Sequence, residues 1–261
     1  MLTRSDPAPA SLLPALRSHL WFASCAIEFQ HALLALGRMR RLQAGESLFV
    51  RGGADDGLCC VVAGAIRLGS VNPRTGAHRL LLYLEPYQWF GEVALIDRHP
   101  RAQDAVADLD SLVLVVPRAR LEPWLDAHPV HWRDLSRLAC GRLRMMVSAT
   151  EDHASLPIEQ QLARRLVLSV SNAGQCAPAH WRRRVRLPQE HLASMLGVSR
   201  QTVNKALRVL AGEGLLSLGY GELEVTDLDG LLARAGELEL QAFAAGAVER
   251  PPVPGATGES V

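Results

Sequence analysis

The chain has 261 residues, a formal charge of +1 and 48% hydrophobic residues, which suits about two domains with apolar cores. No apolar run approaches the roughly 20 residues that a membrane-spanning helix needs, and the N-terminal stretch lacks the apolar core of a secretion signal, so we expect no membrane association. The five cysteines include no C-x-x-C pair. We therefore expect neither a disulfide framework nor a metal site, and a reducing cytoplasm is the favoured location.

The first predicted elements are helices, and a stretch of strands follows them. Residues 10–37 carry apolar residues at helical spacing, with Gly37 placed to end the last helix. Between about 38 and 117, short apolar runs alternate with turn-forming residues, which is typical of a β-sandwich or barrel. The adjacent Cys59 and Cys60 lie in one such run, so their side chains should point to opposite sides of a strand.

A long helix is expected from Val130 to about His153, a stretch with one glycine and no proline. Apolar residues recur there every three or four positions in two stripes. One stripe can pack on the β region and the other on a second copy of the chain, which predicts a dimerisation helix. An ordinary core helix is the alternative. The stripes are Leu135, Ala139, Leu143, Met146 and Thr150, and beside them Leu138 and Met145.

The rest of the chain predicts a second, smaller unit with a basic segment. Residues 155–225 contain an amphipathic helix, a basic strand or loop, two more helices and a hairpin. Between 182 and 208, seven basic residues face one acidic residue, a local charge of +6 that leaves −5 for the remainder. This block predicts a polyanionic partner, with a solvated basic face as the alternative. Beyond 225 we expect a helix and then a disordered tail.

The stretch "LPQEHLASMLGVSRQTVNKALRVL" (187–210) predicts two helices joined by a tight turn. Pro188 can begin the first helix, Gly197 can end it, and Ser199 can cap the second. The second helix, residues 199–211, has an apolar face and a polar, basic face, which is what a helix in the DNA major groove needs. Its apolar residues are Val203, Ala206, Leu207 and Leu210, and its polar residues are Arg200, Gln201, Asn204, Lys205 and Arg208.

With the next six residues, "LPQEHLASMLGVSRQTVNKALRVLAGEGLL" resembles the winged helix-turn-helix signature of the Crp/Fnr family of bacterial transcription regulators. The order of predicted elements agrees with that family over roughly residues 15–225. The resemblance implies an α+β fold in four parts. These are a β-roll sensor domain with N-terminal helices (1–125), a dimerisation helix (126–154), a winged helix-turn-helix domain (155–226), and a C-terminal helix and tail (227–261).

The resemblance implies a cytoplasmic homodimer that reads a near-palindromic operator in double-stranded DNA and contacts RNA polymerase. In relatives, the residues matching Arg200, Gln201 and Lys205 contact bases. Their chemistry agrees, because arginine pairs with guanine, glutamine with adenine, and lysine with guanine or phosphate. Pro188 stands where relatives often have a hydroxyl residue, so one phosphate contact should be missing. The expected DNA-binding residues are Gln189, Ser199, Arg200, Gln201, Thr202, Asn204 and Lys205.

A second stretch, "WFGEVALIDRHPRAQDAVA" (89–107), is similar to the phosphate-binding cassette of cyclic-nucleotide domains. In that family the glutamate, here Glu92, accepts from the ribose 2′-hydroxyl, and the arginine, here Arg101, pairs with the cyclic phosphate. A guanidinium suits a phosphate well, and backbone N–H groups near Gly91 and Ala102 could add donors. The resemblance therefore implies Gly91, Glu92, Arg101 and Ala102 as effector-binding residues.

Several residues depart from a cyclic-AMP site. Asp104 places a carboxylate close to the expected phosphate, which is repulsive. Met146 and Val147 stand where cyclic-AMP-binding relatives have hydroxyl residues that touch adenine, and they cannot donate those hydrogen bonds. Glu92 and Arg101 could instead form a structural ion pair. A cyclic nucleotide, another small effector, or none therefore remain as alternatives.

Other sensor and function classes lack their motifs. An iron–sulfur cluster needs four cysteines, several of them near the N-terminus, where only Cys25 lies. His78 or His99 could bind haem, but no spacing favours it. No P-loop, metal-ligand spacing or G-x-S-x-G motif indicates an enzyme. The alternative to a transcription regulator is a cyclic-nucleotide-binding module that signals through a protein partner.

Overall fold

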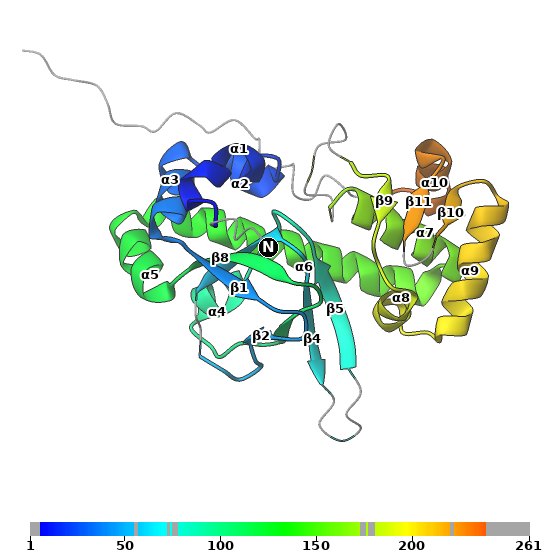
Figure 1. Cartoon of the computed structure of the whole chain (residues 1–261), viewed down its shortest axis with the longest axis horizontal. Coiled ribbons are helices and arrows are strands. Elements are labelled where there is room, and N and C mark those ends of the chain that lie inside the picture. The colour runs from blue at the N-terminus through cyan, green and yellow to red at the C-terminus, as the bar shows by residue number, and fades with distance from the viewer. Residues whose placement is uncertain are drawn as a thin grey trace, which may run out of the picture.

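The computed structural model describes residues 6–54, 57–71, 74, 78–172, 176, 181–219 and 222–238. Figure 1 shows a β domain and a smaller C-terminal domain, with the long helix α6 (Trp132–Ser155) running between them. The predicted α+β class and the order of the parts are confirmed. The predicted disordered tail lies outside the described residues. None of the described helices combines the length and the apolar character that crossing a bilayer requires.

The N-terminal helices cover one side of the β domain and the start of α6 (Figure 1). They bury aromatic rings, with Phe22 stacked on Trp89 at a centroid distance of 5.4 Å. Their order is η1 (Pro9–Leu12), α1 (Leu13–Leu16), α2 (Leu20–Ser24) and α3 (Ile27–Leu36). As predicted, α3 ends at Gly37, whose φ of −77° is ordinary for any residue, so a close approach rather than backbone freedom favours glycine there. A Cβ at this position would lie 2.6 Å from a Leu114 methyl carbon.

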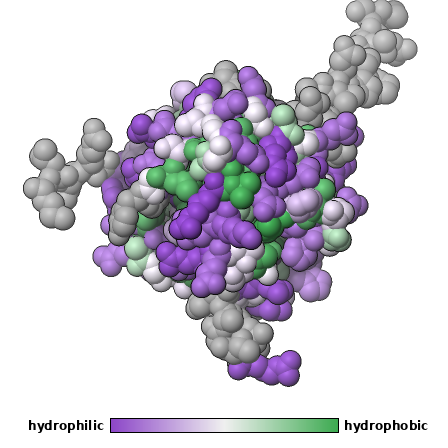
Figure 2. Space-filling model, turned by 90° about the vertical axis from the view of Figure 1, so that its right-hand side faces the viewer, coloured by the Kyte–Doolittle hydropathy of each residue, from purple (hydrophilic) through white to green (hydrophobic). Residues whose placement is uncertain are grey.

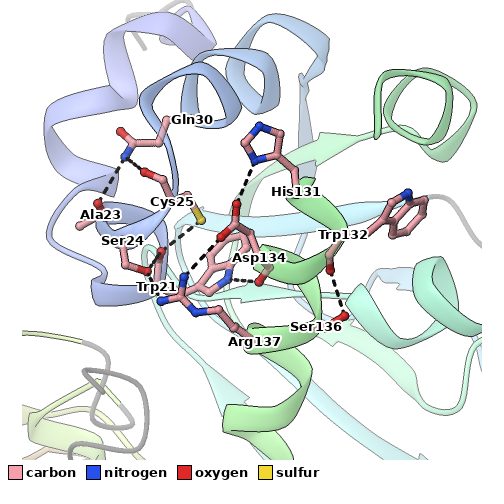
Figure 3. Close-up of polar contacts among 10 residues, drawn as sticks. All are labelled: Trp21, Ala23, Ser24, Cys25, Gln30, His131, Trp132, Asp134, Ser136 and Arg137. Atoms are coloured by element: carbon pink, nitrogen blue, oxygen red, sulfur yellow. Dashed lines mark hydrogen bonds and ion pairs between the residues drawn. The ribbon is translucent and has the colours of Figure 1, made fainter. Parts of the chain in front are cut away.

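Polar contacts fix the N-terminal helices to α6, as Figure 3 shows. The indole Nε1 of Trp21 donates to the backbone oxygen of Asp134 at 2.7 Å. The Asp134 carboxylate contacts His131 at 2.9 Å and accepts from Arg137 at 3.3 Å, and Arg137 also donates to Ser24. Because Asp134 is buried, these partners offset the cost of removing its charge from water.

The β domain consists of two four-stranded antiparallel sheets, in the orders β1-β8-β3-β6 and β2-β7-β4-β5. Their facing sides enclose a core that includes Val61, Ile66 and Phe90. Cys59 belongs to this core and Cys60 to the cluster under the N-terminal helices, so the two thiols point to opposite sides as predicted, and both are buried. The strands are β1 (Arg38–Leu42), β2 (Ser47–Phe49), β3 (Leu58–Ala63), β4 (Ile66–Val71), β5 (His78–Leu84), β6 (Trp89–Phe90), β7 (Asp104–Ala107) and β8 (Ser111–Val116).

The predicted long helix is present, but its stripes divide differently than the sequence indicated. After α5 (Arg118–Ala127) and η2 (Pro129–His131), α6 buries Leu135 and Leu138 against the cluster under the N-terminal helices. Leu143, expected in the same stripe as Leu135, is 61% exposed because it lies beyond the reach of that cluster. Val147 is 50% exposed one turn further on. The middle of α6 therefore keeps an uncovered apolar face.

The C-terminal domain packs helices against a three-stranded sheet of order β10-β11-β9. Its last helix also belongs to the core, because Leu231 and Ala235 are buried in the same cluster as Leu162 and Leu166. The elements are α7 (Ile158–Val170), β9 (Arg184–Val185), α8 (Gln189–Leu196), α9 (Arg200–Gly212), β10 (Leu216–Leu218), β11 (Leu223–Val225) and α10 (Leu228–Ala235).

The C-terminal domain contacts the β domain through α8 and β5. The backbone N–H of Leu80 donates to the Ser194 hydroxyl at 2.9 Å. Beside it, Tyr83 donates to the Asp108 carboxylate at 2.9 Å, and His191 of α8 lies 3.7 Å from the same carboxylate. Burial lowers the pKa of His191, although Asp108 acts in the opposite direction. The first helix of the helix-turn-helix therefore rests on the β domain, and α9 lies beyond it.

Candidate nucleic-acid interface and effector cassette

A tight turn sets the angle between α8 and α9. Gly197 follows α8 with φ 65° and ψ 25°, a left-handed conformation that costs glycine least. Ser199 then caps α9, because its hydroxyl oxygen accepts from the backbone N–H of Thr202 at 3.1 Å. Both predicted roles are confirmed. Pro188 precedes α8 as its N-cap and offers no side-chain hydrogen bond there.

Helix α9 has one face in the core and one face in solvent. Val203, Ala206, Leu207 and Leu210 are buried in the core of the C-terminal domain. The opposite face is polar and basic, and Figure 2 shows that this end of the molecule is largely hydrophilic. On it, Ser199, Arg200, Gln201, Lys205 and Arg208 are exposed, and Thr202 and Asn204 are half-buried.

The cationic side chains of α9 have no acidic partner within the described part of the chain. This holds for Arg200, Lys205 and Arg208. Their charges are therefore available to a ligand, and no internal ion pair has to break first. Gln189, at the start of α8, is half-buried, so its amide is only partly accessible.

The arginines before α8 differ in whether an acidic residue pairs with them. Arg182 pairs with Glu85 of the β domain at 2.8 Å, so it links the two domains. Arg184 lies 3.6 Å from Glu224 of the neighbouring strand. Arg186 is exposed, with no ion pair to another described residue. The local charge of +6 is thus partly neutralised by residues from elsewhere in the fold.

The predicted wing is present as the hairpin of β10 and β11. Leu216 pairs with Val225 and Leu218 with Leu223. Gly219 closes the hairpin through a hydrogen bond from its N–H to the backbone oxygen of Glu222 at 2.9 Å. The tip residues 220–221 lie outside the described residues. The wing extends from the same domain face as α9 and adds a second element beside it (Figure 1).

The cassette forms a short helix and a loop in the β domain. Gly91, with φ 94°, precedes α4 (Glu92–Asp97), and a Cβ there would lie 2.6 Å from a guanidinium nitrogen of Arg101. Arg101 donates to the backbone oxygens of Gly91 at 3.0 Å and Gly57 at 2.6 Å, and its guanidinium lies 4.2 Å from the centre of the Phe49 ring. Arg101 is buried, whereas Ala102 is exposed.

The structure contradicts the structural ion pair between Glu92 and Arg101 that the sequence left open, because Glu92 pairs with a different arginine. Both carboxylate oxygens of Glu92 accept from Arg142 of α6, at 2.8 and 2.9 Å. Arg142 also donates to the backbone oxygen of Trp89 at 2.6 Å. Sequence reasoning missed Arg142, because 50 positions separate it from Glu92 and only the docking of α6 brings them together.

The residues expected to disfavour cyclic AMP have structural roles. Asp104 accepts from the backbone N–H of Arg51 at 2.8 Å, which fixes the loop that follows β2. Met146 packs against the core between the two sheets, while Val147 is half exposed. The charged groups of the cassette therefore already bind protein atoms. His99, one of the two haem candidates, is exposed, and its ring contacts the backbone oxygen of Asp97, the last residue of α4.

Two family models match the chain. The model described as "Cyclic nucleotide-binding domain" matches residues 39–128, and the "Crp-like helix-turn-helix domain" matches residues 160–234. The first contains the cassette and the second contains α8, α9 and the hairpin. Both predicted resemblances thus coincide with the parts of the chain that carry the two candidate sites.

Curated relatives match across both domains. A "CRP-like cAMP-activated global transcriptional regulator" of Mycobacterium tuberculosis is 28% identical over 191 residues, which cover 73% of this chain and 85% of that protein. The "Cyclic AMP receptor protein" of Thermus thermophilus is 28% identical over 206 residues, which cover 79% and 92% of the two chains.

Solved structures have the same fold. A transcriptional regulator of the CRP/FNR family from Thermus thermophilus matches with a TM-score of 0.58 and 26% identity, covering 76% of this chain and 98% of that chain. FixK2 from Bradyrhizobium japonicum matches with a TM-score of 0.64 at 20% identity, covering 77% and 98%. The second likeness shows the fold alone.

Proposed function

We propose that this chain acts as a DNA-binding transcription regulator of the Crp/Fnr type, a cytoplasmic homodimer that reads a near-palindromic operator with α9. The observation that carries this proposal is the division of α9. Its apolar face is buried in the domain core, and its opposite face presents charges that no other described residue neutralises. A helix of this kind can enter the major groove without rearrangement of its own domain.

The roles proposed for the exposed side chains follow from their donors and acceptors. Arg200 offers two parallel donors to guanine, Gln201 matches the donor and acceptor of adenine, and Lys205 can reach guanine or a phosphate. Ser199, Thr202, Asn204 and Gln189 lie at or near the N-terminal ends of α8 and α9, where phosphates are favoured by the free N–H groups.

The uncovered face of α6 supports a homodimer. Leu143 and Val147 lie one turn apart and are 61% and 50% exposed, and the exposed Cys140 precedes them on the helix. Packing this face on its counterpart in a second copy would remove these apolar side chains from water. The two α9 helices would then enter successive major grooves, with half-sites roughly 34 Å apart.

For the cassette, we propose Gly91, Glu92, Arg101 and Ala102 as the residues that would face a small effector such as a cyclic nucleotide. Two relatives are named for cyclic AMP, which supports this assignment. Binding would require Arg101 to leave the oxygens of Gly57 and Gly91, and Glu92 to leave Arg142. Effector binding would therefore act directly on α6, the helix proposed to form the dimer.

RNA polymerase is the proposed partner at the promoter.

The experiment that tests the function is a DNA-binding titration against salt. Operators are selected from random duplexes, and affinity is measured for the wild type and for Arg200→Ala/Gln201→Ala. If about six phosphates are contacted, a plot of the logarithm of affinity against the logarithm of salt concentration should have a slope of about −5. The double variant should lose sequence preference and keep its fold. Binding with neither salt dependence nor sequence preference contradicts the proposal and favours a module that signals through a protein partner.

A further inference from the structure

The last turn of α6 lies against the DNA-binding domain. Figure 1 shows that α6 runs from the N-terminal helices to the domain that carries α9. A Cβ atom on Gly197, in the turn between α8 and α9, would lie 3.7 Å from Cε1 of His153, a residue of that last turn. The joint between α6 and α7 consists of Leu156 and Pro157. Because α7 and α9 share one core, the angle at this joint relates the direction of α9 to that of α6.

One arginine crosses this joint. Arg164, on the second turn of α7, forms an ion pair with the carboxylate of Asp152 in α6. The two side chains are 17% and 20% exposed, so solvent screens their attraction only in part. Among the residues that the structure describes, this is the only ion pair or side-chain hydrogen bond that joins α6 to the C-terminal domain. It is therefore the polar contact that responds most directly to a change in the angle between α6 and α7.

The same guanidinium also binds the C-terminal end of α10. Nε of Arg164 donates to the backbone oxygen of Ala235 at 2.8 Å, and Nη2 donates to the backbone oxygen of Glu237 at 2.8 Å. The amide of Gln160 donates to the Ala235 oxygen as well, at 3.3 Å. Backbone oxygens at the end of a helix have no partner within the helix and carry a partial negative charge, so a guanidinium is favoured there.

Gly236 shapes this end of α10. Its φ of 74° and ψ of −166° belong to a region that is essentially restricted to glycine. A Cβ atom there would also lie 3.0 Å from Nε2 of Gln160. The glycine therefore allows the backbone oxygens on both sides of it, those of Ala235 and Glu237, to reach the same arginine.

The guanidinium is thus held by a fixed part of its own domain. Helix α10 belongs to the domain core, in which Leu231 and Ala235 are buried. A side chain that is already held in place loses little further conformational entropy when it makes another contact. The ion pair between Arg164 and Asp152 should therefore resist changes in the angle between α6 and α7.

We propose that Arg164 is a positioning residue for operator recognition. Held by α10 and by Asp152, it fixes the angle between α6 and the domain that carries α9, and thereby the half-site spacing that the dimer reads. This inference rests on the proposed homodimeric DNA recognition. The hydrogen bond between Leu80 and Ser194 holds the same domain against the β domain, so the loss of Arg164 should loosen the joint without releasing the domain.

In the proposed dimer, the two α9 helices are connected through two copies of the joint. Once one α9 has bound its half-site, the other reaches the second half-site at an effective concentration that depends on how narrowly the connection fixes their separation. A stiff joint raises this effective concentration at one spacing and lowers it at others. A loosened joint gives a lower value that is spread over several spacings, while the contact of each α9 with its own half-site is unchanged.

The test compares duplexes of different half-site spacing. The full chain and Arg164→Met are titrated with a selected operator, with the same operator lengthened or shortened by one base pair between its half-sites, and with a duplex that carries a single half-site. Arg164→Met should bind the selected operator about tenfold more weakly than the wild type and the single half-site equally well. Its preference for the selected spacing over the altered ones should fall accordingly. A merely structural role of Arg164 would lower all these affinities in the same ratio.

Further variants locate the effect at the joint. Asp152→Ala should reproduce the loss of spacing preference, because it removes the other half of the ion pair. Arg164→Lys keeps the charge but not the planar fork, so it should retain part of the preference. Arg234→Met is the matched control, because Arg234 pairs with Glu213 at 3.3 Å within the C-terminal domain and does not contact the joint. It should keep the spacing preference of the wild type.

Hydrogen exchange of the protein without DNA gives a second measurement. In Arg164→Met, the backbone amides of residues 156–161 and of the end of α10 should exchange faster than in the wild type, because the joint opens more often. The amides of α9 should exchange at the wild-type rate, since its buried face does not contact Arg164. Should Arg164→Met not fold, Arg164→Gln, which removes only the charge and the fork, replaces it in both measurements.

The proposal is overturned if the Arg164 variants keep the spacing preference of the wild type, or if Arg234→Met loses it to the same extent. In that case a wild type that still prefers the selected spacing leaves the proposed function standing. A wild type that binds a single half-site as tightly as the full operator contradicts the proposed homodimeric recognition, and the inference with it. Loss of the preference in Arg164→Met, with unchanged binding of the single half-site, supports the positioning role.

Discussion

The cassette and the face of α9 are both rich in charged side chains, but the fold treats those charges in opposite ways. In the cassette, Glu92 is fully buried and paired with Arg142, and Arg101 donates to backbone oxygens. On α9, Arg200 and Lys205 are exposed, with no ion pair to any residue that the structure describes. The first set of charges stabilises the protein, and the second is free for a ligand.

A sequence motif for a ligand therefore does not guarantee that its side chains are free to bind that ligand. A ligand at the cassette must displace contacts that the protein already makes, so binding there is coupled to a change in structure. A duplex at α9 displaces only water and counterions, so binding there depends chiefly on salt and sequence. Substitutions in the cassette should therefore alter stability first, and substitutions on α9 should alter DNA affinity first.

The largest effect is expected when the buried ion pair is broken. Arg142→Met leaves the Glu92 carboxylate buried without its partner, which should cost about 3–5 kcal/mol of unfolding free energy. Thermal unfolding should show a fall in Tm of about 10 °C. Glu92→Gln combined with Arg142→Met should recover much of the loss, because no charge then stays buried. An Arg142→Met variant as stable as the control Arg120→Met would contradict the stabilising role of the ion pair.

A smaller effect, on binding rather than stability, is expected on α9. Arg200→Ala should weaken affinity for a selected operator by about 1–3 kcal/mol, because the guanine contact is lost. Its unfolding free energy should stay within about 0.5 kcal/mol of the wild type, since the side chain is exposed. Fluorescence anisotropy with labelled duplex measures the first and urea unfolding the second. Equal operator affinity in Arg200→Ala and Arg120→Ala would exclude the contact.

Most of the loss of stability at acid pH should come from the buried His19, with a smaller part from His191, whose pKa burial also lowers. Burial lowers its pKa to about 3, with Arg142 acting in the same direction, so the folded state keeps the ring neutral. The unfolded state takes up the proton first. The contribution of His19 is thus complete above about pH 6.5 and falls as pH drops toward about 3, by up to ~1.4 kcal/mol per pH unit.

Urea unfolding at about pH 7 and about pH 5 measures this slope. His19→Gln should have a flatter dependence than the wild type, while His99→Gln, in an exposed loop, should leave it unchanged. A slope in His19→Gln as steep as in the wild type would assign the dependence to other groups.

The smallest effect on stability is expected at Ser199, which both caps α9 and lies in the expected DNA-binding surface. Ser199→Ala removes the cap of α9 and should lower the unfolding free energy by about 1 kcal/mol. Ser199→Asp keeps a capping oxygen and should retain stability, but its negative charge would repel phosphates and weaken DNA binding. Comparing the two variants by thermal unfolding and by anisotropy separates the structural role of Ser199 from its DNA contact. Weaker DNA binding by Ser199→Ala than by Ser199→Asp would contradict the expected repulsion between the introduced carboxylate and the phosphates.

Local patterns predicted much of the DNA-binding domain. The turn at Gly197, the cap at Ser199 and the two faces of α9 each depend on residues within about ten positions of one another, where spacing and side-chain chemistry suffice. The opposite directions of Cys59 and Cys60 were predictable for the same reason, since alternation is a property of the strand itself.

The sequence by itself determined the family resemblance, the order of the parts and the helix that carries the free charges, because these follow from short motifs and local periodicity. Only the tertiary structure decided that Glu92 pairs with Arg142, that Arg182 is held by Glu85, and that Leu143 stays uncovered. These residues come from separate elements, and their contacts exist because packing brings distant segments together, a relation that no local pattern records.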